Sequence, residues 1–396
     1  MPEIIIKPGR EKSLLRRHPW IFSGAVADVR GAPESGETVN VISSTGEFLG
    51  QAAYSPNSNI RGRVWTWEQT EQVTPDFLEN RLKQAIQVRR NINDLIPSNA
   101  LRLVHGESDG LPGLILDQYD SVFVVQFLAA GVEFWRDIIV DIIRRITNAS
   151  LLYERSDVDV RQLEGLPLTT GILYGKILNN PIEIDENGVK MLVDIIEGHK
   201  TGYYLDQRDN RLLARKISNG SKVLDCFAYT GGFTVNCLAG GAVSVALVDS
   251  SNTALRYAQN NIAINNLSTN NVSFVEQDVF KYLRTLRDRA DYFDLVILDP
   301  PKFAPTVSQA ERAARGYKDI NLLALKLINK GGLLMTFSCS GGISEELFQK
   351  IIASAALDAQ VDAVILERLH QSPDHPVALN FPEGQYLKGF LIQKLS

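Results

Sequence analysis

The chain has few cysteines and no long apolar run, and each absence excludes a class of protein. Its 396 residues include three cysteines, Cys226, Cys237 and Cys339, and no C-x-x-C pair. An odd, widely spaced set favours neither a disulfide framework nor a zinc site, so we expect no metal. No apolar run approaches the roughly 18 residues that a membrane span requires, and the charged amino-terminal segment is unlike a secretory signal. These features predict a cytoplasmic protein with no membrane partner.

The chain has no overall excess of positive charge, because its 41 lysines and arginines face 46 acidic residues and the formal net charge is -5. That value alone argues against a nucleic-acid ligand. The basic residues are nevertheless clustered, with five of them between Lys7 and Arg17 against the single acid Glu11. Such a cluster can neutralise several phosphates even on an acidic protein, although a solvated basic loop gives the same pattern. The predicted phosphate-binding residues are Lys7, Arg10, Lys12, Arg16, Arg17, Arg61 and Arg63.

The order of predicted elements divides the chain into parts of different character. Short β-type runs separated by glycine and proline turns come first and predict a small β-barrel. A helix over 74–94 follows, with Thr74 as N-cap and Pro75 at its first position, and it leads into an α+β region. From about residue 197 strands and helices alternate, which is typical of a mostly parallel, doubly wound sheet. The predicted domains are 1–72, 73–190 and 191–396.

The run VLDCFAYTGGF at 223–233 predicts a nucleoside pocket. An apolar strand ends at Asp225, a glycine turn follows, and a second strand closes on Asp249, whose carboxylate can accept hydrogen bonds from both ribose hydroxyls. The G-x-G-x-x-G pattern that a pyrophosphate needs is absent, since only Gly231 and Gly232 are present. Acidic Asp225 would repel a pyrophosphate and attract a sulfonium or ammonium group. The sequence therefore favours S-adenosylmethionine over NAD.

Two later strands place further candidate residues at the same sheet edge. Asp278 follows the third strand, where it can accept the adenine amine, cap the next helix, or do both. The fourth strand, FDLVILD, ends at Asp299 and is followed by Pro300, Pro301 and Lys302. The paired prolines hold the backbone extended where a substrate base would lie.

Cys339 is the candidate nucleophile. The fifth strand delivers it into a turn between two serines, whose small size leaves the thiol reachable, whereas Cys226 and Cys237 lie in apolar runs and fit buried positions. A thiolate that adds to carbon 6 of cytosine turns the unreactive carbon 5 into a nucleophile for a methyl group. Asp299 would share a proton with N3 of the ring. Lys302 would either lower the thiol pKa or contact a phosphate, and the sequence leaves that choice open.

Taken together, these motifs identify a family. The ordered set KPGREKSLLRRHPWIFSGAV, LVHGESDGLPGLILDQY, KTGYYLDQRDNR, DCFAYTGGF, LDPPKFA, SCSGG and DHP closely resembles the large-subunit (23S) ribosomal RNA 5-methylcytosine methyltransferases. Members of that family carry an amino-terminal PUA domain, a central α+β domain and a carboxy-terminal Rossmann-type methyltransferase domain. The resemblance spans nearly the whole chain, and the ordered set is far more specific than any one motif.

The resemblance implies roles for individual residues. Cys339 matches the family's nucleophile and Asp299 its acid, while the further cysteine that the more widespread RNA cytosine-5 enzymes carry in this motif is missing here, so another group would release the product. Gln207 and Arg208 would cover the cofactor, with Arg208 on its carboxylate. The expected cofactor-binding residues are Gln207, Arg208, Asp225, Phe227, Tyr229, Thr230, Gly231, Gly232, Phe233, Asp249, Ser250, Asp278, Asp299 and Pro300.

The same resemblance also implies how the protein would bind RNA. A PUA barrel binds structured RNA, so the basic stretch would orient ribosomal RNA through its phosphates, and a paired target cytosine would leave its stack to reach Cys339. Trp20, Phe22 and Trp65 would stack on bases or belong to the core. The segment DHP would face the substrate, although His375 fits a hydrogen-bonded loop histidine better than a proton shuttle. The expected substrate is large-subunit ribosomal RNA, and a homodimer is left open.

Two other functions compete with carbon-5 methylation. A D-P-P loop also suits methylation of an exocyclic base amine, such as N2 of guanine, which needs no thiol. A non-catalytic RNA-binding assembly protein with a vestigial cofactor fold is the more remote alternative. Loss of activity on replacing Cys339 and binding of S-adenosylmethionine distinguish the three.

Overall fold

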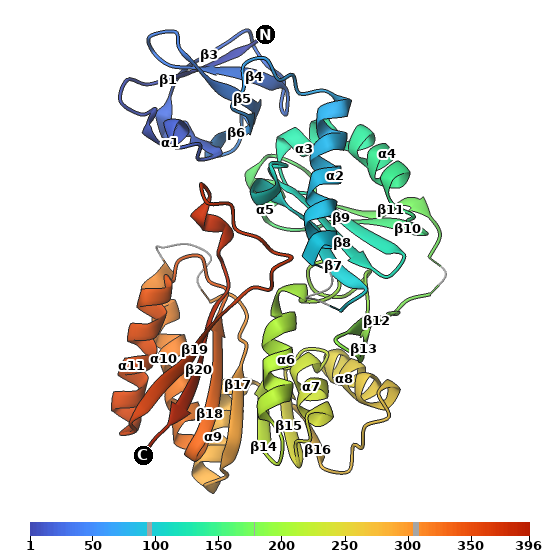
Figure 1. Cartoon of the computed structure of the whole chain (residues 1–396). Helices are drawn as coiled ribbons and strands as arrows, with labels where there is room; N and C mark the ends of the chain where they lie inside the picture. Colours follow the sequence, from blue (N-terminus) through green and yellow to red (C-terminus); the bar gives the residue numbers. More distant parts are fainter. Residues whose placement is uncertain (93–96, 178, 304–308) are drawn as a thin grey trace. The chain divides into compact units, whose positions relative to one another are not determined.

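The computed structural model describes residues 1–92, 97–177, 179–303 and 309–396, and it comprises two compact units (Figure 1). The chain passes between the units several times, so neither unit is one continuous segment. The expected boundaries after residues 72 and 190 stay predictions. Unit 1 contains Met1–Ile184, Val193–Leu205 and Pro373–Gly384, and unit 2 contains Asp185–Leu192, Asp206–Ser372 and Gln385–Ser396.

Unit 1 begins with a six-stranded sheet that corresponds to the expected barrel. Its strand order is β2-β6-β5-β4-β1-β3, and its core holds buried apolar residues such as Val39 and Val41, which alternate along β4. The elements are β1 (Glu3–Ile6), α1 (Lys12–Leu15), β2 (Trp20–Phe22), β3 (Val26–Arg30), β4 (Thr38–Ile42), β5 (Phe48–Tyr54) and β6 (Ile60–Thr66).

The second part of unit 1 is the expected α+β region. Helix α2 (Pro75–Ile92) starts where predicted, because the Thr74 hydroxyl accepts a hydrogen bond from Phe77 N at 3.3 Å; its predicted last residues, 93 and 94, lie outside the described residues. A five-stranded sheet of order β11-β10-β9-β8-β7 follows. Its elements are β7 (Ala100–His105), β8 (Leu114–Tyr119), β9 (Val122–Phe127), α3 (Ala130–Phe134), α4 (Arg136–Ile146), β10 (Leu151–Ser156), α5 (Val160–Leu163) and β11 (Thr169–Gly175). The hairpin β12 (Ile182–Glu186) and β13 (Val189–Val193) leads to unit 2.

Unit 2 is built on a seven-stranded sheet of order β16-β15-β14-β17-β18-β20-β19. Five neighbouring strands are parallel, in the order β16, β15, β14, β17 and β18. Strand β20 runs antiparallel to both of its neighbours, β18 and β19. The predicted mostly parallel, doubly wound sheet is therefore confirmed. Its strands are β14 (Lys222–Cys226), β15 (Ser244–Asp249), β16 (Val272–Glu276), β17 (Phe293–Leu298), β18 (Ile328–Ser338), β19 (Ala363–His370) and β20 (Lys388–Lys394).

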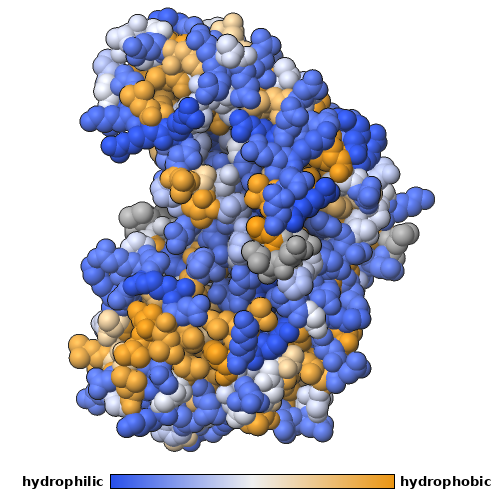
Figure 2. All heavy atoms as spheres, viewed as in Figure 1, coloured by the Kyte–Doolittle hydropathy of each residue, from blue (hydrophilic) through white to orange (hydrophobic). Residues whose placement is uncertain are grey.

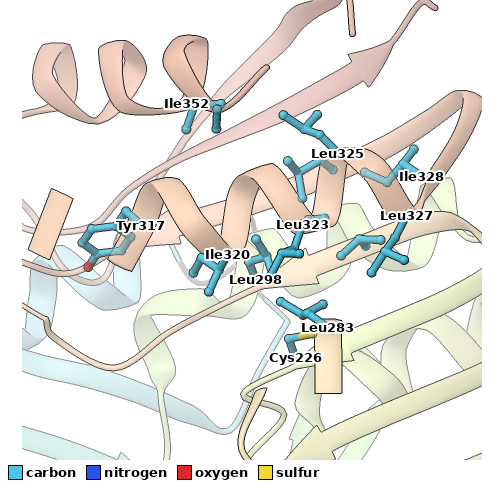
Figure 3. Close-up of a cluster of buried hydrophobic side chains, with 14 of the residues drawn as sticks. Cys226, Leu283, Leu298, Tyr317, Ile320, Leu323, Leu325, Leu327, Ile328 and Ile352 are labelled. Carbon is cyan, nitrogen blue, oxygen red and sulfur yellow. The ribbon is translucent and has the colours of Figure 1, made fainter. Parts of the chain in front are cut away.

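Helices cover both faces of this sheet. On one face α6 and α7 pack in an apolar cluster with residues such as Ile297 and Phe337, and α8 packs nearby against Leu247. On the other face α9, α10 and α11 pack around Cys226, Leu298 and Tyr317 (Figure 3). The helices are α6 (Arg208–Ile217), α7 (Gly232–Ala239), α8 (Asn252–Ile264), α9 (Val279–Arg289), α10 (Ala310–Leu327) and α11 (Glu345–Ala359).

An apolar groove lies beside α11, β19 and β20. Figure 2 shows hydrophobic residues gathered over this part of the surface, and the groove encloses about 450 Å³ between Ile352, Ala356, Val364 and Ile392. Ile352 and Ile392 belong to the α9–α11 side of the sheet. The groove is therefore on the opposite face from α6 and α7. Among the described helices, none is long and apolar enough to cross a membrane.

Candidate active site

Three predicted site residues lie together where the parallel strands of unit 2 end. Odd-numbered residues of β14, β17 and β18 face α6 and α7, and side chains of a strand alternate between the two faces. Asp225 and Asp299 continue these rows and are close enough for each charge to affect the other, and Cys339 packs against the same cluster. The carboxyl ends of the central strands thus carry two acids and a thiol on one face.

The turn between β14 and α7 has an unusual backbone. Phe227 and Tyr229 have φ of 62° and 48°, and Gly231 has φ of 77°. A Cβ at Gly231 would also approach Ala258 Cβ to 2.8 Å, so this position requires glycine. At residues other than glycine, a left-handed conformation costs about 1–3 kcal/mol. Such conformations persist where the surrounding structure enforces them, commonly at binding sites.

Asp225 lies beneath this turn and is almost completely buried. Its Oδ2 accepts hydrogen bonds from Thr234 N at 3.1 Å and Thr234 Oγ1 at 2.7 Å. Burial raises the pKa of Asp225 to about 7, with help from Asp299 and Asp249 and against the hydrogen bonds of Thr234. Within the described residues, Asp225 Oδ1 and the buried Thr230 Oγ1 have no hydrogen-bond partner. An acceptor and a hydroxyl left unsatisfied under a strained turn fit a ligand that brings its own donors and positive charge.

The other two strand-tip acids also contact backbone N–H groups. Asp249 Oδ2 accepts a hydrogen bond from Tyr229 N at 2.9 Å, which ties β15 to the turn, and Oδ1 accepts one from Ser251 N. Asp278 caps α9 by accepting a hydrogen bond from Lys281 N at 3.0 Å, so the helix-cap interpretation is confirmed. A carboxylate oxygen accepts more than one hydrogen bond, so a nucleoside contact by either acid remains compatible with these bonds.

The segment before β14 reaches Asp299. Gln207 Nε2 donates to Asp299 Oδ1 at 2.9 Å, and Gln207 Oε1 accepts a hydrogen bond from Asn210 Nδ2 at 2.6 Å. Arg208 is the first residue of α6 and is fully buried. The predicted cofactor-covering element therefore orients the predicted acid, a contact that spacing in the sequence does not reveal.

The turn that carries Cys339 is held by hydroxyl groups. Tyr317 of α10 accepts a hydrogen bond from Ser338 Oγ at 2.9 Å, and its hydroxyl lies 2.9 Å from Ser340 Oγ. Ser340 Oγ also accepts a hydrogen bond from Phe303 N, which joins this turn to the loop after β17. The two serines were predicted only to be small, but they fix the backbone on both sides of Cys339. Tyr317 was missed, because no motif marks a helix residue that lies some 20 positions earlier.

Exposure separates the three cysteines. Cys226 and Cys237 are fully buried, and burial raises the pKa of each thiol. Cys339 is partly exposed. In the loop after β17, Pro300 is buried and Lys302 is exposed, while 304–308 lie outside the described residues. The predicted contrast between buried and reachable thiols is confirmed, and the role of Cys339 stays a prediction.

On unit 1 the structure separates the predicted RNA-binding residues. Lys7, Arg10, Lys12, Arg16 and Arg17 are exposed on the barrel. Arg63 is not available for phosphates, which corrects its prediction. Its side chain is 7% exposed and lies 2.8 Å from Glu164 and 3.5 Å from Glu107. Arg61 is partly exposed and its guanidinium donates to the carbonyl oxygens of Pro56 and Ser55.

The three barrel aromatics also have different surroundings. Trp65 is 3% exposed and belongs to the apolar core, so it is removed from the predicted stacking residues. Trp20 Nε1 donates to Glu107 at 2.8 Å and its ring packs against Phe381. Phe22 is 50% exposed and is the aromatic best placed to meet a base.

Asp374 and His375 lie in a buried polar cluster of unit 1. His375 Nδ1 is 3.0 Å from Asp374 Oδ1, and the His375 ring packs edge-on against His105. Asp374 also accepts a hydrogen bond from Arg102 N at 2.9 Å. Burial lowers the pKa of His105 well below its ordinary value, with further effects from His375 and two arginines. These contacts favour the structural interpretation of His375 over a proton shuttle.

Comparison with known proteins assigns two parts of the chain to protein families. Residues 168–385 match the family model of S-adenosylmethionine-dependent methyltransferases, and residues 4–67 match that of PUA-like domains. The first match confirms S-adenosylmethionine as the cofactor. Two relatives named ribosomal RNA large subunit methyltransferase I, from Shewanella frigidimarina and Erwinia tasmaniensis, are each 49% identical, covering 98% of this chain and 98% of their own.

Solved structures agree on the fold. A provisionally assigned S-adenosylmethionine-dependent methyltransferase from Streptococcus mutans superposes with a TM-score of 0.86 at 23% identity, covering 99% of this chain and 100% of that chain. A second provisionally assigned methyltransferase, in complex with S-adenosylhomocysteine, superposes with a TM-score of 0.87 at 24% identity and the same coverage. The chain therefore belongs to the S-adenosylmethionine-dependent methyltransferases with an amino-terminal PUA-like domain, the family of the ribosomal RNA large subunit methyltransferases I.

Proposed function

We propose that this protein transfers a methyl group, in the cytoplasm, to carbon 5 of a cytosine in large-subunit ribosomal RNA through a covalent bond between Cys339 and carbon 6. The observation that carries the proposal is the partly exposed thiol of Cys339 on the same sheet face as Asp225 and Asp299. The names of relatives that share half of the sequence support ribosomal RNA as the substrate.

The chemistry explains why a thiol is needed. Carbon 5 of cytosine is a poor nucleophile, but addition of the Cys339 thiolate at carbon 6 pushes electrons towards carbon 5. When bound, S-adenosylmethionine supplies a methyl group activated by its sulfonium charge. After methylation, loss of the carbon-5 proton expels the thiolate and restores the aromatic ring. The partly exposed position of Cys339 between two tethered serines suits a group that must approach the ring edge.

Asp299 is assigned the second role. A proton shared between its carboxyl group and N3 of cytosine would stabilise the charge that appears as the thiolate adds. The hydrogen bond from Gln207 fixes one oxygen of Asp299 and leaves the carboxyl group oriented. Lys302 is exposed, which favours contact with the substrate phosphate over a role in a dry pocket.

The cofactor would be held around the strained turn. Asp225 and Thr230 have buried polar atoms that would meet its cationic end. Asp249 and Ser250 would bind the ribose, and Asp278 would bind the adenine. Arg208 would pair with its carboxylate. The remaining proposed contacts are Phe227, Tyr229, Gly231, Gly232, Phe233 and Pro300.

Product analysis tests the function directly. The protein is incubated with ribosomal RNA and labelled S-adenosylmethionine, and the RNA is digested to nucleosides for chromatography. We expect the label in 5-methylcytidine. Label in an N-methylated base would instead establish exocyclic-amine methylation, and no label with any ribosomal RNA, despite cofactor binding, would refute the proposal.

The pKa of Asp225 predicts how cofactor binding depends on pH. A carboxyl pKa raised to about 7 means that Asp225 is largely neutral below pH 7, so the affinity for a cation should rise with pH by up to about tenfold per unit below the pKa. In the unliganded protein the raised pKa favours the fold fully below the ordinary carboxyl pKa of 3.8, and this contribution is lost as the pH rises from there to about 7. Calorimetry between pH 5.5 and 8.5 measures the affinity. Asp225→Asn should flatten the profile, and an equally steep profile in that variant would contradict the assignment.

The basic surface of the barrel predicts a loss of RNA affinity. Replacing exposed Arg10 and Arg16 with glutamine should weaken binding for all RNA sequences and reduce the slope of log affinity against log salt by about two, since each phosphate contact contributes about one. Filter binding at several salt concentrations measures this. Arg144→Gln, an exposed arginine of α4, is the matched control. Equal slopes for both variants would exclude the basic stretch from the RNA interface.

A further inference from the structure

Lys388 is a buried lysine beside the turn that carries Cys339. It begins β20 and pairs in register with Ser338, the residue before Cys339. Lys388 is 7% exposed, although lysine is almost never buried unless it is paired. Its Nζ donates to two backbone carbonyl oxygens, Ser340 O and Ile343 O, both at 2.8 Å. Carbonyl groups hold an ammonium in place, but they do not neutralise its charge.

Among the charged groups near Lys388, Cys339 has the largest effect on the pKa of Lys388. Burial lowers the pKa of Lys388. A thiolate at Cys339 would raise that pKa more than any other neighbouring charge, while Lys302 lowers it and Glu345 raises it. The charge of Glu345 is offset by its ion pair with Arg368, and Lys302 is exposed, so water screens its charge. Electrostatic coupling is reciprocal, so a cation that is stabilised by a thiolate also stabilises that thiolate.

The geometry separates this role from direct catalysis. Residues paired across antiparallel strands point to the same face, so Lys388 lies with Ser338 on the α10 side, and Cys339 packs on the opposite side. Tyr317 also lies near Cys339, and burial raises its pKa, which leaves it neutral. The acids Asp225 and Asp299 lie on the same sheet face as Cys339, and their ionised forms oppose a thiolate. Lys388 therefore lies on the other side of the sheet from Cys339, where it can affect the turn that carries the thiol but does not contact the substrate ring.

We infer that Lys388 is a positioning residue for Cys339: its ammonium fixes the turn that carries the sulfur and favours the thiolate over the thiol. The thiol proton leaves to solvent, and the lysine stays protonated. This inference rests on the role proposed for Cys339. It predicts that removal of the charge makes the sulfur harder to ionise even when the turn stays folded.

The test is the pH dependence of Cys339 alkylation in the full chain, without RNA or cofactor. Iodoacetamide reacts with thiolates, and peptide mass spectrometry distinguishes Cys339 from the buried Cys226 and Cys237. In Lys388→Met we expect the midpoint of the rate profile to rise by about one pH unit, which is a fall in rate of about tenfold near neutral pH. Lys388→Gln, which keeps N–H donors for the carbonyls but has no charge, should show the same rise.

Lys394 provides a matched control on the same strand. Its Nζ also donates to two carbonyl oxygens, Leu325 O and Ile328 O, and burial lowers its pKa. Lys394→Met should lower the melting temperature without moving the alkylation midpoint. An unchanged midpoint in a folded Lys388→Met or Lys388→Gln variant would overturn the inference. If the midpoint moves but RNA methylation survives Cys339→Ala, the electrostatic pairing stands and the covalent route fails.

Discussion

Replacing Cys339 with alanine is expected to abolish 5-methylcytidine formation. Removal of an attacking nucleophile costs other covalent enzymes on the order of 10⁴-fold to 10⁶-fold in rate, because the remaining groups bind the substrate without activating it. Cys339 is only partly buried and alanine keeps its β-carbon, so the variant should fold and bind S-adenosylmethionine like the wild type. Nucleoside analysis and calorimetry on the same preparation measure both properties.

Two comparisons sharpen this experiment. Cys237→Ala removes a fully buried thiol of α7, and we expect it to lose some stability but to retain methylation. RNA that contains 5-fluorocytosine should form a complex with the wild type that survives denaturation, because the fluorine cannot leave as a proton does. Full activity of Cys339→Ala would favour methylation of an exocyclic amine, which needs no thiol.

The largest loss of stability is expected for Arg89→Met in unit 1. Arg89 is 1% exposed and its guanidinium donates to both carboxylate oxygens of Asp109, at 2.5 Å and 2.8 Å, and to the carbonyl oxygens of Arg102 and Asp374. Methionine fills similar volume but leaves a buried carboxylate without its counter-charge, which costs about 3–5 kcal/mol. Chemical denaturation followed by fluorescence should show this loss in the midpoint.

The control is an arginine whose ion pairs are exposed. Arg145 of α4 is 50% exposed and pairs with Glu79 and Asp141 at the surface. Such pairs contribute about 0–1 kcal/mol, so Arg145→Met should change stability little. Equal midpoints for the two variants would mean that the Arg89 cluster adds nothing beyond a surface ion pair.

Local signals in the sequence predicted the elements and the residues that end them. Thr74 was expected to cap α2 and does so, because a hydroxyl followed by proline and an acid is a local start signal. An acid was likewise expected at the end of each apolar run, since such a run is visible in the sequence. Strand β15 ends at Asp249 as predicted, whereas β14 continues one residue past Asp225 and β17 stops one residue before Asp299. Contacts between distant segments were not predictable in this way. Nothing near Arg63 in the sequence indicates that Glu164 will neutralise it.

In the candidate site, too, local features were predictable from the sequence and contacts between distant segments were not. The sequence by itself determined the cofactor and predicted the chemistry and the candidate nucleophile, because a glycine turn, an acid near the end of four strands and a cysteine between small residues are local features of the sequence. Only the tertiary structure decided that Gln207 orients Asp299, that Tyr317 ties the two serines around Cys339, and that Lys388 lies under the same turn. The reason is that hydrogen bonds and charges act over a few ångströms in space, and the packing of whole helices and strands determines which distant residues come within that range.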